Sequence, residues 1–421
     1  MSMNEQMNHA EENILHTYNR FPVMFDHGEG CYLYDTEGKK YLDFAAGIAV
    51  NSLGYHYPGY DEALKAQIDK LTHISNLYYN EPMSEAGEKL VKASGLSKAF
   101  FTNSGTEAIE GALKSARKYA YTKYGKEAGK YEIIAMNHSF HGRSMGALSV
   151  TGTEHYREPF EPLVGGVKFA DFNDLDSVKA QITDKTCAII TEVVQGEGGI
   201  YPAKKEFLEG LRALCDQKDI ILIFDEIQCG MGRTGCYFAW QSYGVKPDVM
   251  TCAKALGCGV PVGAFVLGEK AAAASLVPGD HGTTYGGNPF VCAAVSKVFD
   301  IYEKDDILAH VQELTPYLEE QLDKLVDKYP VVAARRGKGF MQGLVITGTT
   351  VGSIVTKALE NGLLVISAGS DVLRLVPPLV ITKEKHLFIF SDKQVPFHIP
   401  SLCFMQDFFP VFRPSHRYFL L

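Results

Sequence analysis

One acid and one lysine follow two apolar runs of the chain. Residues 220–224 form a short run rich in Ile and Leu that ends at Asp225, and a second run over 248–253 ends at Lys254. Such runs are typical of strands buried on both faces of a parallel sheet, and sheets of this kind bind ligands at the carboxyl ends of their strands. A lysine there can form a Schiff base, and an acid can keep a pyridine nitrogen protonated. The pair predicts pyridoxal phosphate chemistry, with Lys254 and Asp225 as catalytic residues.

Each of the two residues also has an ordinary interpretation. A lysine beside glycines is usually solvated, and Asp225 alone would suit a helix N-cap or a metal ligand. We therefore base the prediction on the two residues together and on the sequence around them.

A second feature is the segment 102–107, Thr-Asn-Ser-Gly-Thr-Glu, which follows an apolar run and precedes apolar residues at helical spacing. Ser104 and Glu107 are three residues apart, as in a capping box. The free amides of such a helix start form an anion site, and Gly105 would let a phosphate approach closely. On this motif alone, a plain helix cap is the favoured interpretation.

A third candidate segment is 137–143, which contains Phe140, His141 and Arg143. An aromatic side chain can stack on a flat cofactor ring, and a guanidinium binds a carboxylate in bidentate fashion. The ordinary alternatives are a core phenylalanine, a satisfied buried histidine and an arginine in a surface salt bridge.

The elements that would position these residues alternate between strand and helix. Strands are predicted at 99–102, 132–136, 187–194, 220–224 and 248–252, with helices between them such as 207–216. This alternation indicates an α/β fold with a doubly wound, mainly parallel sheet. After residue 306 the pattern changes to a long amphipathic helix over 307–329 and short strands near 339–346 and 373–375, which indicates a smaller α+β domain.

The predicted domain boundaries follow from these patterns. Residues 1–60 comprise an irregular or helical arm over 1–30 and a hairpin over 30–44, and are expected to join the small domain. Residues 61–305 are the large cofactor-binding domain, and 306–384 are the C-terminal small domain.

Composition excludes several classes of protein. The chain of 421 residues has a net charge of −9 and carries its basic residues without a long basic run, so nucleic acid is not an expected partner. Nine cysteines without a C-x-x-C pair predict free thiols and no metal site. With no signal-peptide pattern and no apolar run near the ~20 residues that a membrane helix needs, we expect a cytoplasmic protein without a membrane partner.

The segments around Asp225 and Lys254 resemble those of the class III aminotransferases of fold-type I. Asp225-Glu226-Ile227-Gln228 matches the family's D-E-[IV]-Q element, and Lys254-Ala255-Leu256-Gly257 matches its lysine turn, with Cys258 in place of a common glycine. The resemblance implies a fold-type I transferase that binds pyridoxal 5′-phosphate. It also implies the cofactor-binding residues, which are Ser104, Gly105, Thr106, Phe140, His141, Asp225, Gln228, Lys254, Thr283 and Thr284.

The same resemblance implies the substrate site and a homodimer. Arg143 would bind the substrate α-carboxylate, and Arg374 would be a second carboxylate site that Glu197 closes or opens. The family's threonine at position 284 reaches the phosphate of the partner subunit, which implies shared active sites.

Within the family, segments 17–22 and 43–54 resemble members that act on N-acetylornithine. The implied reaction is amino transfer from N-acetylornithine to 2-oxoglutarate, giving N-acetylglutamate 5-semialdehyde and glutamate in arginine biosynthesis. The alternatives are an aminotransferase for ornithine, GABA or succinyl-diaminopimelate, an aminomutase that needs no 2-oxoglutarate, and an inactive chain.

The family pattern ends near Glu384. Residues 385–421 are rich in phenylalanine and contain prolines at 396, 400, 410 and 414, which exclude one continuous helix. We interpret this tail as the product of a reading-frame shift, with a genuine extension as the alternative.

Overall fold

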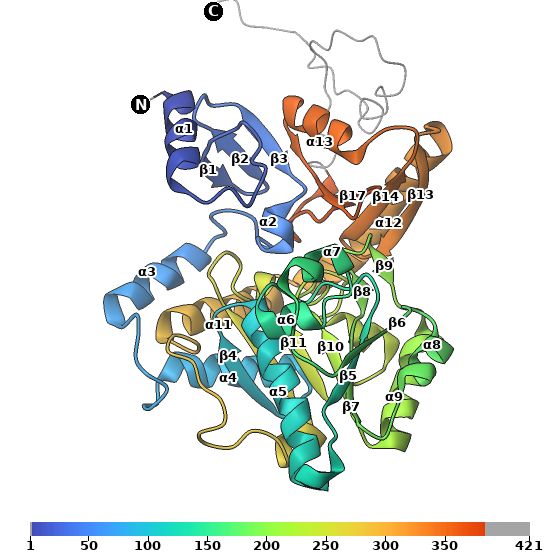
Figure 1. Ribbon diagram of the computed structural model, residues 1–421. Helices are drawn as coiled ribbons and strands as arrows, with labels where there is room; N and C mark the ends of the chain where they lie inside the picture. The colour runs from blue at the N-terminus through green and yellow to red at the C-terminus, as the bar shows by residue number, and fades with distance from the viewer. Residues whose placement is uncertain (1, 384–421) are drawn as a thin grey trace, which may run out of the picture.

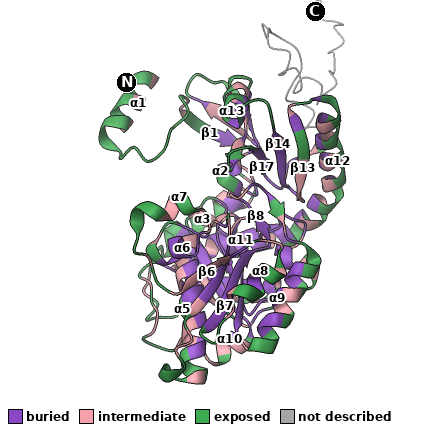
Figure 2. Ribbon diagram, turned by 45° about the vertical axis from the view of Figure 1, so that its right-hand side comes forward, coloured by how far each residue is buried: buried purple, intermediate pink, exposed green. Residues whose placement is uncertain are grey.

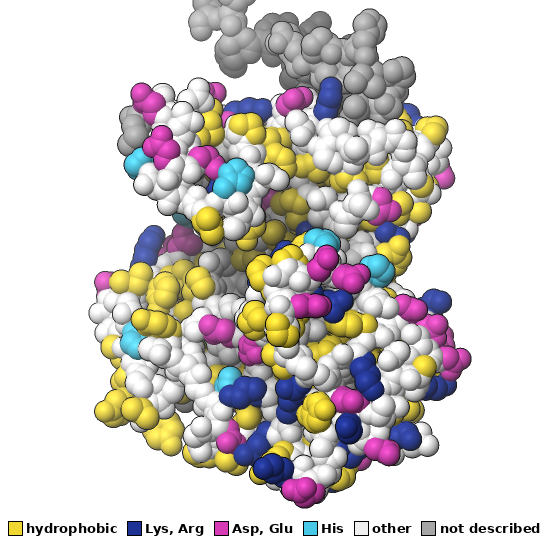
Figure 3. All heavy atoms as spheres, viewed as in Figure 1, with side chains coloured by type: hydrophobic (Ala, Val, Ile, Leu, Met, Phe, Trp, Pro, Cys, Tyr) yellow, Lys and Arg dark blue, Asp and Glu magenta, His cyan; other side chains and the backbone are white. Residues whose placement is uncertain are grey.

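The computed structural model describes residues 2–383, in a lower lobe around one large sheet and an upper lobe with two smaller sheets (Figure 1). The interpretation of residues 385–421 as a frameshift product therefore lies outside the described residues. The space-filling view shows a hollow between the two lobes (Figure 3).

The large sheet has seven strands in the order β4-β12-β11-β10-β7-β5-β6. Their bounds are β4 Lys98–Thr102, β5 Glu132–Met136, β6 Val167–Ala170, β7 Thr186–Glu192, β10 Ile221–Asp225, β11 Val249–Cys252 and β12 Gly263–Leu267. Strands β11, β10, β7, β5 and β6 run parallel, and β12 is antiparallel to both of its neighbours. The mainly parallel sheet is confirmed, while β6 and β12 were not predicted.

The strands of the large sheet are buried (Figure 2), and their alternate residues belong to two separate cores, one on each face of the sheet. Ile221 and Ile223 of β10 pack with the apolar face of α5, Gly105–Tyr124. Leu222 and Phe224 pack on the opposite face, in a core that includes residues of α9, Lys205–Lys218. Burial on both faces is why these strands are continuously apolar in sequence.

Other helices complete the lower lobe. They are α3 Tyr60–Lys70, α4 Glu81–Ser94, α6 Met145–Ser149, α7 Glu154–Arg157, α8 Leu175–Gln181, α10 Glu269–Ala273 and α11 Pro289–Lys304. Helix α11 packs against both α3 and α4. None of the helices within residues 2–383 is both long and apolar enough to cross a membrane.

The upper lobe contains an antiparallel sheet in the order β13-β14-β17-β16. Its elements are β13 Val332–Lys338, β14 Met341–Ile346, β16 Ile366–Ala368 and β17 Val372–Leu375, with helices α12 Ile307–Lys328 and α13 Val351–Glu360. The amphipathic helix over 307–329 is confirmed. The strand expected near 339–346 is one arm of the longer β13–β14 hairpin.

The N-terminal segment forms the third sheet. Helix α1, Met3–Asn13, precedes β1 Phe25–Glu29, β2 Tyr32–Asp35 and β3 Lys40–Asp43, and β3 pairs in parallel with β15, Leu363–Leu364. The predicted hairpin is confirmed. Residues 1–30 were predicted to be irregular or helical, which is wrong for β1. No strand pattern is visible there, because four of the five residues of β1 are exposed and show no apolar alternation. The β3–β15 pairing links the N-terminal hairpin to the C-terminal part of the upper lobe.

Candidate active site

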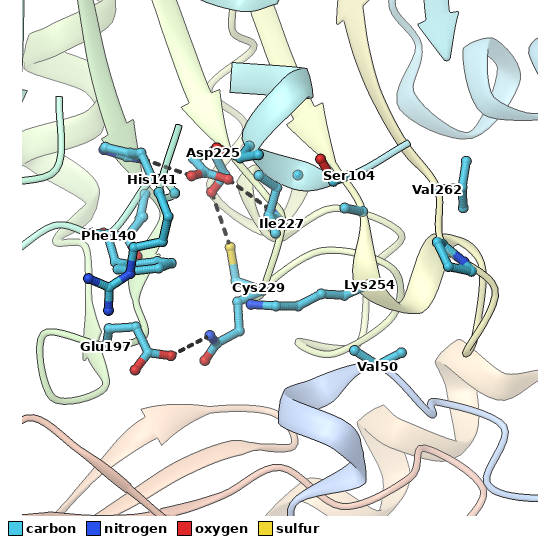
Figure 4. A pocket seen from close by; sticks show the side chains of 18 of the residues that line it. Val50, Ser104, Phe140, His141, Glu197, Asp225, Ile227, Cys229, Lys254 and Val262 are labelled. Atoms are coloured by element: carbon cyan, nitrogen blue, oxygen red, sulfur yellow. Dashed lines mark hydrogen bonds and ion pairs between the residues drawn. The ribbon is translucent and has the colours of Figure 1, made fainter. Parts of the chain in front are cut away.

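A cavity of about 450 Å³ lies at the carboxyl ends of β10 and β7 (Figure 4). Asp225 and Glu192 are the last residues of these two strands and occupy paired positions in the sheet. Of the predicted site residues, the cavity is lined by Ser104, Gly105, Thr106, Phe140, His141, Arg143, Glu197, Asp225, Gln228 and Lys254. The structure thus gathers ten residues that span 151 positions of the chain, because parallel strands place their carboxyl ends at one edge.

Asp225 is held by contacts to both of its carboxylate oxygens. Its Oδ2 lies 2.7 Å from Nδ1 of His141, and its Oδ1 accepts hydrogen bonds from the Ile227 amide at 3.0 Å and the Thr251 hydroxyl at 3.1 Å. Asp225 is 3% exposed. These contacts fix the orientation of a buried carboxylate, which is what a partner for a ring nitrogen requires.

Lys254 follows β11 and begins the short 3-10 helix Lys254–Leu256. Its φ of 51° lies in the left-handed region, which is uncommon for a lysine and concentrates at functional sites. Burial lowers the pKa of its ammonium group below the ordinary value, and the Arg374 charge acts in the same direction. A lowered pKa favours the neutral amine, the form that acts as nucleophile or base.

The start of α5 opens onto the cavity. The Ser104 hydroxyl caps it by accepting a hydrogen bond from the Glu107 amide at 3.4 Å. A Cβ atom on Gly105 would lie 2.9 Å from Ile227, so only glycine lets the helix start approach this side chain. The predicted capping box is half present, because Glu107 accepts instead from the Asn103 amide at 2.8 Å. The Gly105 and Thr106 amides of the first helical turn have no partner within the helix and remain available to an anion.

The predicted pair of Glu197 and Arg374 is present in the structure. The Arg374 guanidinium donates to both carboxylate oxygens of Glu197, to Oε1 of Gln228 at 3.0 Å and to the Ser367 carbonyl at 3.0 Å. Arg374 is 3% exposed. Burial alone would raise the pKa of Glu197, but the charge and hydrogen bonds of Arg374 outweigh it and lower that pKa. The guanidinium that was predicted to be a second carboxylate site is therefore already paired with Glu197.

Arg143 presents the opposite arrangement. Its guanidinium carbon lies 3.8 Å from the ring centroid of Tyr156 and 5.3 Å from that of Phe140. Among residues 2–383 it has no hydrogen bond or ion pair, and it is exposed in the cavity wall.

Thr283 and Thr284 do not line this cavity. The Thr283 hydroxyl accepts a hydrogen bond from the Asn103 amide group at 3.2 Å, and Thr284 is exposed. Neither lies on the cavity wall with Lys254.

The pattern of the family described as aminotransferase class-III matches residues 14–391. The chain belongs to the class III aminotransferases. The protein is therefore an aminotransferase.

Relatives resemble this class III aminotransferase over most of its length. The acetylornithine aminotransferase of Clostridium acetobutylicum is 50% identical over 387 residues, 91% of this chain and 99% of that protein. The succinylornithine transaminase of Yersinia pseudotuberculosis is 45% identical over 382 residues, 89% of this chain and 92% of that protein. A structure of the ornithine aminotransferase of Toxoplasma gondii, with pyridoxal phosphate partially occupying its active site, is 30% identical with a TM-score of 0.87 and covers 91% of each chain.

The cavity of this class III aminotransferase fits pyridoxal phosphate. Lys254 would bind its aldehyde carbon, Asp225 its ring nitrogen and the start of α5 its phosphate, while Phe140 would lie against the ring. Gly105 lies on the cavity wall and carries no side chain that could obstruct a phosphate there. No group of three or more His, Cys, Asp or Glu side chains in residues 2–383 is arranged to hold a metal ion.

Sequence reasoning missed Glu192 in this aminotransferase. Its carboxyl accepts hydrogen bonds from the Gly196 amide at 3.2 Å and the Phe140 amide at 3.4 Å. Burial, and then the Asp225 charge, raise the pKa of Glu192 well above its ordinary value. An acid near the end of the predicted strand 187–194 was the available signal, but that strand ends at Glu192 and not at 194.

A second unpredicted acid is Glu226, directly after Asp225. Its carboxylate accepts from the Ala239 and Trp240 amides at 2.8 and 2.9 Å. Burial raises the pKa of Glu226 to about 7, even though these two hydrogen bonds lower it. Glu226 thereby joins the end of β10 to the short 3-10 helix Ala239–Tyr243.

Proposed function

We propose that this class III aminotransferase transfers the amino group of N-acetylornithine to 2-oxoglutarate, with pyridoxal phosphate as cofactor. The products are N-acetylglutamate 5-semialdehyde and glutamate. The observation that carries the proposal is a pair of unlike arginines: Arg143 lies open on the cavity wall, and Arg374 lies behind Glu197, which lines the cavity and pairs with it. The named relatives, which are aminotransferases for acylated ornithines, support the choice of amine donor.

The unlike arginines suit a reaction with two different substrates. N-acetylornithine has one carboxylate, which Arg143 would bind while Glu197 covers Arg374. 2-Oxoglutarate has two carboxylates, and its second one would replace Glu197 on Arg374. The charge of Arg374 is therefore exposed only to the substrate that can neutralise it, which avoids an unpaired buried charge in the other half of the cycle.

Bound pyridoxal phosphate supplies an electron sink for the carbon that carries the transferred nitrogen. Asp225, oriented by His141 and Thr251, would hold the proton on the ring nitrogen. The Lys254 amine would take the proton from the amine-bearing carbon and return it during the exchange, as a general base and then a general acid. Its lowered pKa keeps it closer to the working pH.

We further propose a homodimer with shared active sites. Leu77 and Tyr79 are 85% and 96% exposed, and Tyr285 is 61% exposed. The two segments that carry these residues are adjacent, because the Asn76 side chain donates to the Gly286 carbonyl at 2.8 Å. A large apolar surface of this kind marks a protein interface. Thr284 is next to Tyr285 in this surface. In a dimer formed through it, Thr284 of one subunit would approach the phosphate site of the other.

We also propose a cytoplasmic location. The cysteines among the described residues are free thiols, which suits a reducing compartment.

The test is a comparison of amine donors with the purified full-length protein and 2-oxoglutarate. N-Acetylornithine and succinylornithine should give the highest kcat/KM, and ornithine, GABA and succinyl-diaminopimelate should be at least about tenfold lower, a difference of about 1.4 kcal/mol. A higher kcat/KM for GABA or for ornithine would show that the protein is instead an aminotransferase for that amine. Turnover of an amine without any 2-oxoglutarate would indicate an aminomutase, and no turnover with any donor would indicate an inactive chain.

A further inference from the structure

Within residues 2–383, the Arg143 guanidinium contacts aromatic rings and has no hydrogen bond or ion pair. Its guanidinium carbon lies 3.8 Å from the Tyr156 ring centroid, and the rings of Tyr156 and Phe140 meet edge to face with centroids 6.1 Å apart. A guanidinium that stacks on an aromatic face keeps its in-plane N–H donors free. Arg143 can therefore take a carboxylate without first breaking an ion pair, whereas Arg374 must release Glu197.

Tyr156 is itself fixed in place by the surrounding chain. Tyr156 belongs to α7. The next residue of this helix, Arg157, has its guanidinium carbon 4.2 Å from the ring centroid of Phe169 on β6. Ahead of the helix, the Gly152 amide donates at 3.0 Å to the Ser139 carbonyl, so the chain leading to Tyr156 is tied to the segment that carries Phe140. On its other side, the Tyr156 ring meets the His155 ring with centroids 3.9 Å apart.

We propose that Tyr156 is a positioning residue that holds the Arg143 guanidinium in its carboxylate-binding orientation and so sets the affinity of the enzyme for both substrates. The inference rests on the proposed function, in which Arg143 binds a carboxylate of each substrate. Tyr156 does not line the cavity, and of the two wall residues that its ring contacts, Phe140 and Arg143, only Arg143 would bind a carboxylate.

The experiment compares Tyr156→Leu, Tyr156→Phe and Arg143→Gln in the holoenzyme, with Tyr121→Leu as the control at an exposed tyrosine of α5. Tyr156→Leu should raise KM for N-acetylornithine and 2-oxoglutarate about three- to fivefold with kcat within about twofold, the range expected for one cation–π contact at an exposed arginine. Tyr156→Phe keeps the aromatic face and should match the wild type. The single-turnover rate with n-butylamine, which has no carboxylate, should not change in the Tyr156 variants or in Tyr121→Leu.

A double-mutant cycle separates the two claims. In the Arg143→Gln background, Tyr156→Leu should give no further rise in KM. An additive rise, an unchanged KM in Tyr156→Leu, or an equal loss with n-butylamine would overturn the positioning role. If Tyr156→Leu does not fold, Tyr156→Met takes its place with the same expectations. If Arg143→Gln itself leaves both KM values unchanged, the substrate role of Arg143 fails, and that failure is distinct from a failure of Tyr156 alone.

Discussion

At the scale of single residues, the chemistry depends on how each charged group is partnered. Lys254 is desolvated, Asp225 has both oxygens bonded, and Arg374 is neutralised by Glu197. The Arg143 guanidinium, like the Lys254 amine, has no hydrogen bond or ion pair among the described residues. The two arginines of this region thus differ in availability, although their side chains are chemically identical.

The Glu197 carboxylate should decide which substrate reaches Arg374. In Glu197→Gln the Arg374 charge loses its ionic partner but keeps a hydrogen-bonding neighbour. We expect KM for 2-oxoglutarate to fall a few-fold and kcat/KM for N-acetylornithine to fall, because free anions would now compete for the uncovered arginine. Steady-state kinetics with each substrate varied in turn would measure both effects. Equal changes for the two substrates would contradict a gating role.

Sequence predicted these residues where a local motif carries them. Asp225 and Lys254 each end an apolar run, and Ser104 precedes a helix, so their positions follow from local pattern. Glu192 also ends a buried strand, but it was hidden because the predicted strand ran on to 194, and Tyr156 has no local pattern that marks it. Tyr156 meets Arg143 only after the chain has turned back through α6 and α7.

At the scale of elements, strands with long apolar runs were predicted within one or two residues. Strand β12 was missed because it follows the glycine-rich turn 256–263 directly, and only its pairing with β4 and β11 marks it as a strand. Strand β1 is mostly exposed and takes its conformation from pairing with β2. Both β12 and β1 depend on pairing with neighbouring strands, which a local sequence pattern does not reveal.

Glu226, which links β10 to the 3-10 helix Ala239–Tyr243, should make the unfolding free energy depend on pH. The native pKa of Glu226 is raised from 4.5 to about 7, so the native state keeps a proton that the unfolded state loses near 4.5. Stability from this group is fully present below pH 4.5 and is lost as pH rises through about 7. Wild type should therefore lose on the order of 3 kcal/mol of unfolding free energy across this window relative to Glu226→Gln.

Urea unfolding at several pH values measures this difference. Glu206→Gln, at an exposed acid of α9, is the control and should follow the wild type. Parallel pH profiles for wild type and Glu226→Gln would show that Glu226 does not titrate in this range.

At the scale of the whole molecule, a hollow separates the two lobes (Figure 3), and the exposed side chains of Leu77, Tyr79 and Tyr285 belong to the proposed dimer interface. The mainly parallel α/β class was predictable because helix and strand patterns alternate over much of the chain. The boundaries at 60 and 305 stay a prediction.

A charge within the proposed interface should separate the subunits. Tyr79→Asp would bury a carboxylate without a partner, and we expect the dimer dissociation constant to rise at least about thirtyfold, or about 2 kcal/mol. Sedimentation velocity measures this. Tyr121→Asp, at another exposed tyrosine, should remain dimeric. A dimer of unchanged strength in Tyr79→Asp would place the interface elsewhere.

The central claim, that Lys254 carries the amino transfer, is tested most directly by Lys254→Ala beside Lys246→Ala, a variant of an exposed lysine eight positions earlier. Transamination of N-acetylornithine with 2-oxoglutarate and the visible absorbance of the purified protein are measured in both. The account predicts that Lys254→Ala loses the activity by at least about 10³-fold, as is typical for loss of a covalent and acid–base catalyst, together with the visible band of the lysine-bound cofactor. Lys246→Ala should keep both. Activity and absorbance retained in Lys254→Ala would contradict the account.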